Sequence, residues 1–170
     1  MEAAPRMSRT RAHERPAPGR SLGTHPGSPA GAAGRPVLLA TMDVPFDGSA
    51  SAVAVDAAVE SGQALIVANF VGLPPLPLSV VMGYDDLGYS EEMDRSLRAP
   101  AELARSLGLH VERLKVKSLH PIQALLDLAR ERSPGLLVFG PDRAKLGRIR
   151  FRRTVRALRD RATCLIWLPS

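Results

Sequence analysis

The stretch VLLATMDVPFDGSASAVAVDAAVESGQALIVANF, residues 37–70, decides the fold of this 170-residue chain. Residues 37–42 and 65–70 are almost entirely apolar, which is typical of strands in a parallel sheet covered on both faces. Between them, apolar side chains recur at helical spacing, at Ala52, Val55, Ala58 and Val59. Gly62 stands where such a helix would end. The stretch therefore predicts a strand, a helix and a second strand.

The same alternation continues along the chain. A helix is expected over residues 91–107, with one apolar stripe made of Met93, Leu97, Ala101, Ala104 and Leu107. Pro100 should kink or restart this helix, because proline lacks the N–H that the helix needs. Residues 109–116 predict a strand whose charged side chains suit the edge of a sheet.

The C-terminal part predicts two more helix–strand pairs. Pro121 opens a helix whose inner face consists of Ile122, Leu125, Leu126 and Ala129, and Ser133-Pro134-Gly135 closes it. Residues 136–139 predict a buried strand, and a loop is expected from residue 140 to about 152. The last helix is expected over 154–161 and the last strand over 163–168.

Strands that alternate with helices imply an α/β fold with right-handed crossovers. We therefore expect a single doubly wound domain with a five-stranded parallel sheet. Ligands bind such sheets beyond the carboxyl ends of the strands, where the strand order reverses. Candidate sites thus follow Met42, Phe70 and Phe139.

Two segments fall outside this pattern. Residues 1–34 are rich in Arg, Pro, Gly and Ala and hold almost no large apolar side chain, so we expect a disordered tail before a domain at 35–170. The tail either contacts acidic partners or lies upstream of the natural start. The connection 72–90 is long and apolar, which indicates either a functional cover or a disordered insertion.

Composition bounds the function. Residues 141–170 hold nine Lys or Arg and two acidic residues, yet only Phe151 interrupts the basic run, so a solvated face is favoured over a nucleic-acid surface. GC-rich coding is another source of the arginines. Cys164 is the single cysteine and, like Trp167, is interpreted as a core or interface residue.

Several classes of function find no support in the sequence. The four histidines have no metal-ligand spacing, and no catalytic triad or pair of carboxylates is visible, so we expect no enzyme. No apolar run reaches the length of a membrane span, and no export signal is seen. A cytoplasmic location is therefore expected.

The stretch GPDRAKLGRIRFRRTV, residues 140–155, resembles the nucleotide loop of the universal stress protein family, G-x2-G-x9-G-(S/T). Gly140 matches the first glycine and Thr154 the hydroxyl residue. Arg143 and Arg153 stand where the family has its other two glycines. The order of elements over about residues 36–169 is also similar to that family.

The resemblance implies a Rossmann-like fold of the adenine-nucleotide-hydrolase type, and a stress-response regulator that dimerises through its last strand. It implies ATP or another adenine nucleotide as ligand, with Asp43 near adenine and ribose. Gly140, Thr154 and the backbone of Val155 would hold phosphates. Members that have lost the glycines resemble this chain and bind no ATP.

Glycine lets a phosphate loop approach its ligand closely, and arginine does not. Arg143 and Arg153 therefore leave three possibilities: an occluded or weakened ATP site, an arginine-lined anion site, or ordinary binding. Thr154 has a second interpretation, as the N-cap of a following helix. Asp47 and Ser49 are interpreted as turn and N-cap residues.

The function expected from these features is a stress-type regulatory protein with a weakened or altered nucleotide site. The alternative is an adaptor that holds an acidic partner, nucleic acid included, through its arginine-rich face and its tail.

Overall fold

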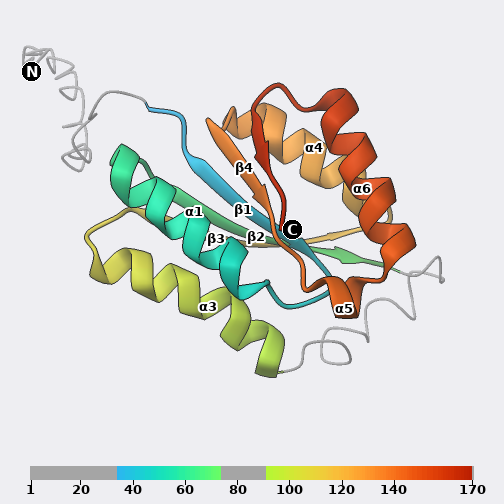
Figure 1. Ribbon diagram of the computed structural model, residues 1–170, viewed down its shortest axis with the longest axis horizontal. Coiled ribbons are helices and arrows are strands. Elements are labelled where there is room, and N and C mark those ends of the chain that lie inside the picture. Colours follow the sequence, from blue (N-terminus) through green and yellow to red (C-terminus); the bar gives the residue numbers. More distant parts are fainter. Residues whose placement is uncertain (1–33, 74–90, 170) are drawn as a thin grey trace, which may run out of the picture. The chain divides into compact units, whose positions relative to one another are not determined.

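A computed structural model describes residues 34–73 and 91–169 of the chain (Figure 1). The expected tail 1–34 and most of the connection 72–90 lie outside the described residues. Five parallel strands form one sheet: β1 (Val37–Met42), β2 (Leu65–Gly72), β3 (Val111–Ser118), β4 (Leu136–Phe139) and β5 (Leu165–Trp167). The expected five-stranded α/β fold is confirmed.

The strand order is β3-β2-β1-β4-β5, so the direction of winding reverses between β1 and β4. β1 pairs with β2 along its whole length, with Val37 opposite Leu65 and Met42 opposite Phe70. On its other side, β1 pairs with β4 from Val37 to Ala40. The order places β3 and β5 at the two edges. Charged side chains on β3 thus lie at an edge, as the sequence predicts.

Helices cover both faces of the sheet (Figure 1). Their bounds are α1 (Gly48–Ser61), α3 (Glu91–Ser106), α4 (Pro121–Arg132), α5 (Arg143–Leu146) and α6 (Arg148–Arg161). Side chains of α1 and α3 share one apolar core with Leu39 and Val67, and those of α4 and α6 share another with Leu38 and Phe70. None of the helices in the described ranges is long and apolar enough to cross a membrane.

The first helix is capped by one of the two residues that the sequence indicates, whereas Ser49 lies inside its first turn. Asp47 is the N-cap, and its carboxylate accepts the backbone N–H groups of Ser49 and Ala50. The Ser49 hydroxyl also donates to it, and this bond, followed by the two backbone bonds, lowers the pKa of Asp47 against the effect of partial burial. Gly62 ends the helix in the left-handed region. The inner face is Ala50, Ala54, Val55 and Ala58, whereas Ala52 and Val59 are exposed.

Two element boundaries differ from the expected ones on the α3 side. The helix neither ends nor restarts at Pro100, because this residue is buried on the inner stripe and its packing offsets the missing hydrogen bond. Leu107 lies beyond the helix and is 55% exposed, so it is not part of the stripe. The edge strand begins at Val111 and runs to Ser118, because it pairs with all eight residues of β2.

The largest error concerns residues 140–152, which were expected to form a loop. Asp142 caps the short helix α5 through the N–H of Ala144, and α6 begins directly after Gly147. The last helix is therefore six residues longer than expected at its start. Arginine is a good helix former, and the six residues that precede Thr154 contain neither proline nor glycine.

The last strand is shorter than expected, 165–167 in place of 163–168. Cys164 and Trp167 both pack against the core while remaining partly accessible. Burial raises the pKa of the Cys164 thiol, which disfavours the reactive thiolate. This supports their interpretation as packing residues.

Gly140, the glycine that matches the family loop, is buried where β4 meets the start of α1. A Cβ added there would lie 2.1 Å from Cβ of Ala50 and 3.5 Å from its Cα. Its N–H donates to the carbonyl of Ala40 at 3.0 Å. Close packing of the helix start on the strand end therefore requires glycine at this position.

We predict that Gly140→Ala lowers the free energy of unfolding by about 1–3 kcal/mol, because the added methyl group overpacks this contact. Gly48→Ala is the matched control, since a Cβ there meets nothing within 4 Å. Urea denaturation of both variants measures the difference. Equal stability of the two variants would contradict the packing role of Gly140.

Candidate functional site

The reversal of strand order places the expected crevice at the carboxyl ends of β1 and β4. The loops that follow these strands are joined by backbone contacts. Phe46 and Pro141 form an antiparallel bridge. The N–H of Asp47 donates to the carbonyl of Gly140 at 2.9 Å, and the N–H of Asp142 donates to the carbonyl of Pro45 at 2.8 Å. We call this contact the loop bridge. It joins the loop after β1 to the loop after β4 through their backbones.

Beside the loop bridge, the chain turns sharply at Asp43, directly after β1. Asp43 has φ 55°, a left-handed conformation that aspartate tolerates better than most residues. Two buried side chains hold this turn. Asn69 accepts the N–H of Asp43 at 3.2 Å, and the hydroxyl of Thr41 donates to the carbonyl of Val44 at 2.7 Å.

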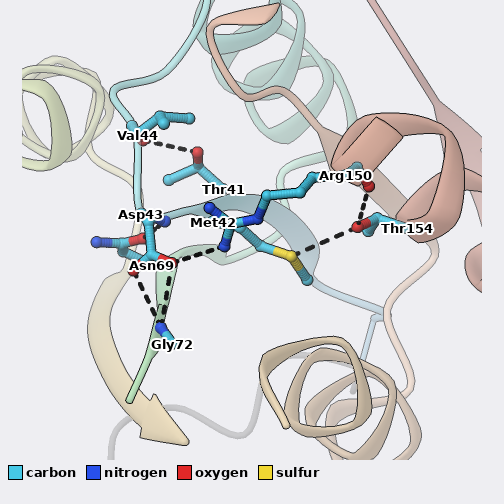
Figure 2. A network of polar contacts seen from close by, with 8 residues as sticks. All are labelled: Thr41, Met42, Asp43, Val44, Asn69, Gly72, Arg150 and Thr154. Atoms are coloured by element: carbon cyan, nitrogen blue, oxygen red, sulfur yellow. Dashed lines mark hydrogen bonds and ion pairs between the residues drawn. The ribbon is translucent and has the colours of Figure 1, made fainter. Parts of the chain in front are cut away.

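The carboxylate of Asp43 accepts hydrogen bonds from two groups of the protein itself (Figure 2). It accepts the backbone N–H of Gly72, with N–O distances of 3.0 and 3.2 Å to its two oxygens. Its Oδ2 also accepts Nη2 of Arg150 at 2.9 Å. The side chain of Asp43 is 26% exposed and that of Arg150 is 54% exposed. This group ties the ends of β1 and β2 to the first turn of α6.

Arg150 is the site residue that the sequence did not reveal. It lies 107 positions from Asp43, inside a segment that was expected to be a loop. A helix beginning near residue 148 would have placed Arg150 and Thr154 on one face, since residues four apart lie one above the other.

Thr154 is not an N-cap, because α6 begins at Arg148 and Thr154 lies in its middle. The side chain is 1% exposed. Its hydroxyl contacts the carbonyl of Arg150 at 3.0 Å and Sδ of Met42 at 3.6 Å (Figure 2). The N–H of Val155, one residue further, is an interior helix donor and bonds four residues back.

Arg143 and Arg153 do not meet in one site. The guanidinium of Arg143 lies 5.1 Å from the ring centroid of Phe151, which in turn stacks on Phe139 at 5.9 Å. This is the geometry of a cation–π contact. Arg153 instead lines a groove together with Thr154.

That groove, which we call the α4–α6 groove, lies between α6 and the start of α4 and has a volume of about 560 Å³. Its lining includes Met42, His120, Pro121, Arg150, Arg153 and Thr154. The apolar side chains and the arginines of this lining suit a ligand with both apolar and anionic parts. Among residues 34–73 and 91–169, no three side chains of the metal-ligating types gather at one place.

We predict that Asp43→Ala lowers the free energy of unfolding by about 2 kcal/mol, through the left-handed backbone and the lost acceptor for two donors. Asp43→Gly should cost about 1 kcal/mol, because glycine adopts this conformation freely and only the acceptor is lost. Arg150→Ala should cost less than about 1 kcal/mol, since the ion pair is half exposed. Urea denaturation distinguishes the three, and equal losses for Ala and Gly at position 43 would contradict the backbone contribution.

No family model and no curated protein matches the sequence. Solved structures do match. A universal stress protein in complex with cAMP is 22% identical, with 81% of this chain and 98% of that chain covered and a TM-score of 0.53. The universal stress protein from Archaeoglobus fulgidus in complex with dAMP is 17% identical, with coverages of 79% and 96% and a TM-score of 0.52. Universal stress protein UspA from Lactobacillus plantarum is 16% identical, with coverages of 81% and 99% and a TM-score of 0.54. The fold implied by the loop resemblance is thus confirmed: the chain has the fold of universal stress proteins.

Proposed function

We propose that this protein is a non-enzymatic, universal-stress-protein-like regulator whose adenine-nucleotide site is weakened because the chain occupies it with its own groups. One observation carries the proposal: Arg150 and the N–H of Gly72 take the carboxylate of Asp43. The family resemblance places this carboxylate near the adenine and the ribose. Two neighbours of this fold are described as complexes with cAMP and dAMP, which supports an adenine nucleotide as the ligand class.

The groups that the resemblance assigns to the phosphates also form hydrogen bonds with other groups of the chain. The N–H of Gly140 donates to Ala40, the hydroxyl of Thr154 contacts the carbonyl of Arg150, and the N–H of Val155 lies inside α6. A triphosphate would therefore find few free backbone donors. We therefore expect the affinity to come from the nucleoside part, so that ATP binds only slightly more tightly than adenosine.

The cost of admitting a ribose is modest. Arg150 must leave Oδ2 of Asp43, and a half-exposed ion pair of this kind contributes at most about 1 kcal/mol. Such a cost corresponds to about a fivefold loss of affinity. The ribose position is thus weakened and not abolished, which suits a regulator that responds to high ligand concentrations.

Removal of Arg150 tests the occupied site. We expect Arg150→Ala to bind adenosine up to about fivefold more tightly than the wild type, because the substitution releases the carboxylate of Asp43. Adenosine has no phosphate, so the loss of the Arg150 charge removes no ionic contact with this ligand. Arg152→Ala, on the same helix but outside the groove, should bind like the wild type. Calorimetric titration with adenosine measures both.

ATP separates the remaining alternatives. If arginines served the phosphates, Arg150→Ala would weaken ATP while leaving adenosine unchanged, and that pattern would overturn the proposal. Loss of adenosine binding in Arg150→Ala, with the fold intact by circular dichroism, would overturn it as well.

The proposal includes a homodimer formed through β5 and a cytoplasmic location. β5 is one of the two edge strands of the described sheet, and Leu165 on it is 74% exposed. An apolar edge strand is a ready surface for pairing with a second copy. A single cysteine suits a reducing compartment.

We predict that Leu165→Lys shifts the protein from dimer to monomer, because the substitution places a charge at the centre of the proposed interface. Leu107→Lys is the control, since Leu107 is exposed to 55% and lies away from β5. Light scattering at high micromolar concentration reports the mass of each variant. A monomeric wild type at that concentration would contradict the dimer.

A further inference from the structure

α6 carries a second concave surface, made of different residues from those that line the α4–α6 groove. Residues three and four positions apart in a helix are neighbours, so its lining forms one continuous face of α6. We call this surface the α6 hollow, and its volume is about 260 Å³. It is lined by Phe151, Arg152, Val155, Arg156, Arg159 and Asp160.

The apolar part of this lining is held in place by the core. Phe151 and Val155 are half-buried, and both pack against the core cluster of the sheet. The ring of Phe151 also stacks on Phe139, and the guanidinium of Arg143 lies 5.1 Å from its centroid. A partner that covers this ring therefore loses little affinity to the ordering of side chains.

The charged part of the lining is dominated by three arginines. Arg152 and Arg159 form no ion pair with any residue in the ranges 34–73 and 91–169. Arg156 approaches Asp160 at 3.8 Å, but the two side chains are 87% and 63% exposed, and a pair so exposed contributes little. All three guanidinium groups can therefore pair with carboxylates of another molecule.

The mixture of charges and apolar side chains distinguishes between occupants. A solvated face, which the sequence favours for this run, explains the arginines but leaves Phe151 and Val155 unexplained. Nucleic-acid phosphates would pair with the arginines and would also leave these two side chains uncovered. The volume is smaller than the 300 Å³ or so of a usual small-molecule site, so it suits one side chain of a larger partner. Protein interfaces combine arginines with an apolar anchor in this way.

We propose that the α6 hollow docks an acidic segment of a partner protein. The segment places one aliphatic side chain against Phe151 and Val155. Its carboxylates pair with the three arginines of the hollow. The surface involves neither Asp43 nor the α4–α6 groove, so this inference goes beyond the proposed function and does not depend on it.

The probe is a fluorescently labelled pentapeptide in which one leucine stands between two glutamates on either side. A second peptide has alanine in place of leucine and the same charge. We expect saturable binding of the leucine peptide by fluorescence anisotropy, and about tenfold weaker binding of the alanine peptide, because leucine buries more apolar surface. This ratio should persist when the salt concentration is raised, since salt screens the ion pairs and not the apolar contact.

Two double variants locate the binding surface. Arg152→Gln combined with Arg159→Gln should raise the Kd of the leucine peptide about tenfold, because two exposed ion pairs are lost. The matched control combines Arg153→Gln with Arg161→Gln, which removes the same charge from α6 but changes the α4–α6 groove instead. Its Kd should stay within about twofold of the wild type. Melting temperatures of both variants confirm that each is folded.

Four results would overturn the inference. Equal losses in the two double variants would show attraction to the charge of α6 as a whole. Equal binding of the leucine and alanine peptides would remove the aliphatic anchor. A single-stranded oligonucleotide of the same net charge that binds more tightly than the leucine peptide would make this face a nucleic-acid surface. Absence of saturable binding of the leucine peptide would remove the docking site.

Discussion

The hydrogen bonds to the carboxylate of Asp43 join three parts of the chain that are far apart in sequence. β1 ends at this residue, Gly72 ends β2, and Arg150 belongs to the first turn of α6. The left-handed turn at Asp43 is what directs the carboxylate towards both donors, and Asn69 holds that turn from the neighbouring strand. The ion pair fixes the first turn of α6 beside the strand ends, and Leu158 in the apolar core holds the rest of the helix on the sheet.

The same contacts give a physical reason for the weakened nucleotide site that we propose. Hydrogen-bonding groups that an open crevice would offer to a ligand are used here by the chain itself. The loop bridge joins the two loops through their backbones, and Gly140 allows α1 to pack against the strand end. Each of these contacts stabilises the fold and withdraws a donor or an acceptor from a ligand. On this proposal, stability and ligand affinity compete at this edge of the sheet.

The sequence predicted the sheet and most of the helices, because buried parallel strands and amphipathic helices impose their period on the chain. The Asp47 cap and the Gly62 end followed from local backbone chemistry in the same way. The candidate site was harder to predict from the sequence. A loop motif aligned Arg143 and Arg153 with two glycines, but α5 and α6 turn one towards Phe151 and the other into the groove.

Arg150 shows why the rest could not be predicted. No local pattern around Arg150 or Asp43 indicates that the two residues pair, because the contact depends on where α6 begins and on the pairing of β4 with β1. The helix start itself was hidden by a run of arginines, which reads equally well as a solvated loop. Contacts between residues so distant in sequence are set by topology and are not recorded in any short pattern.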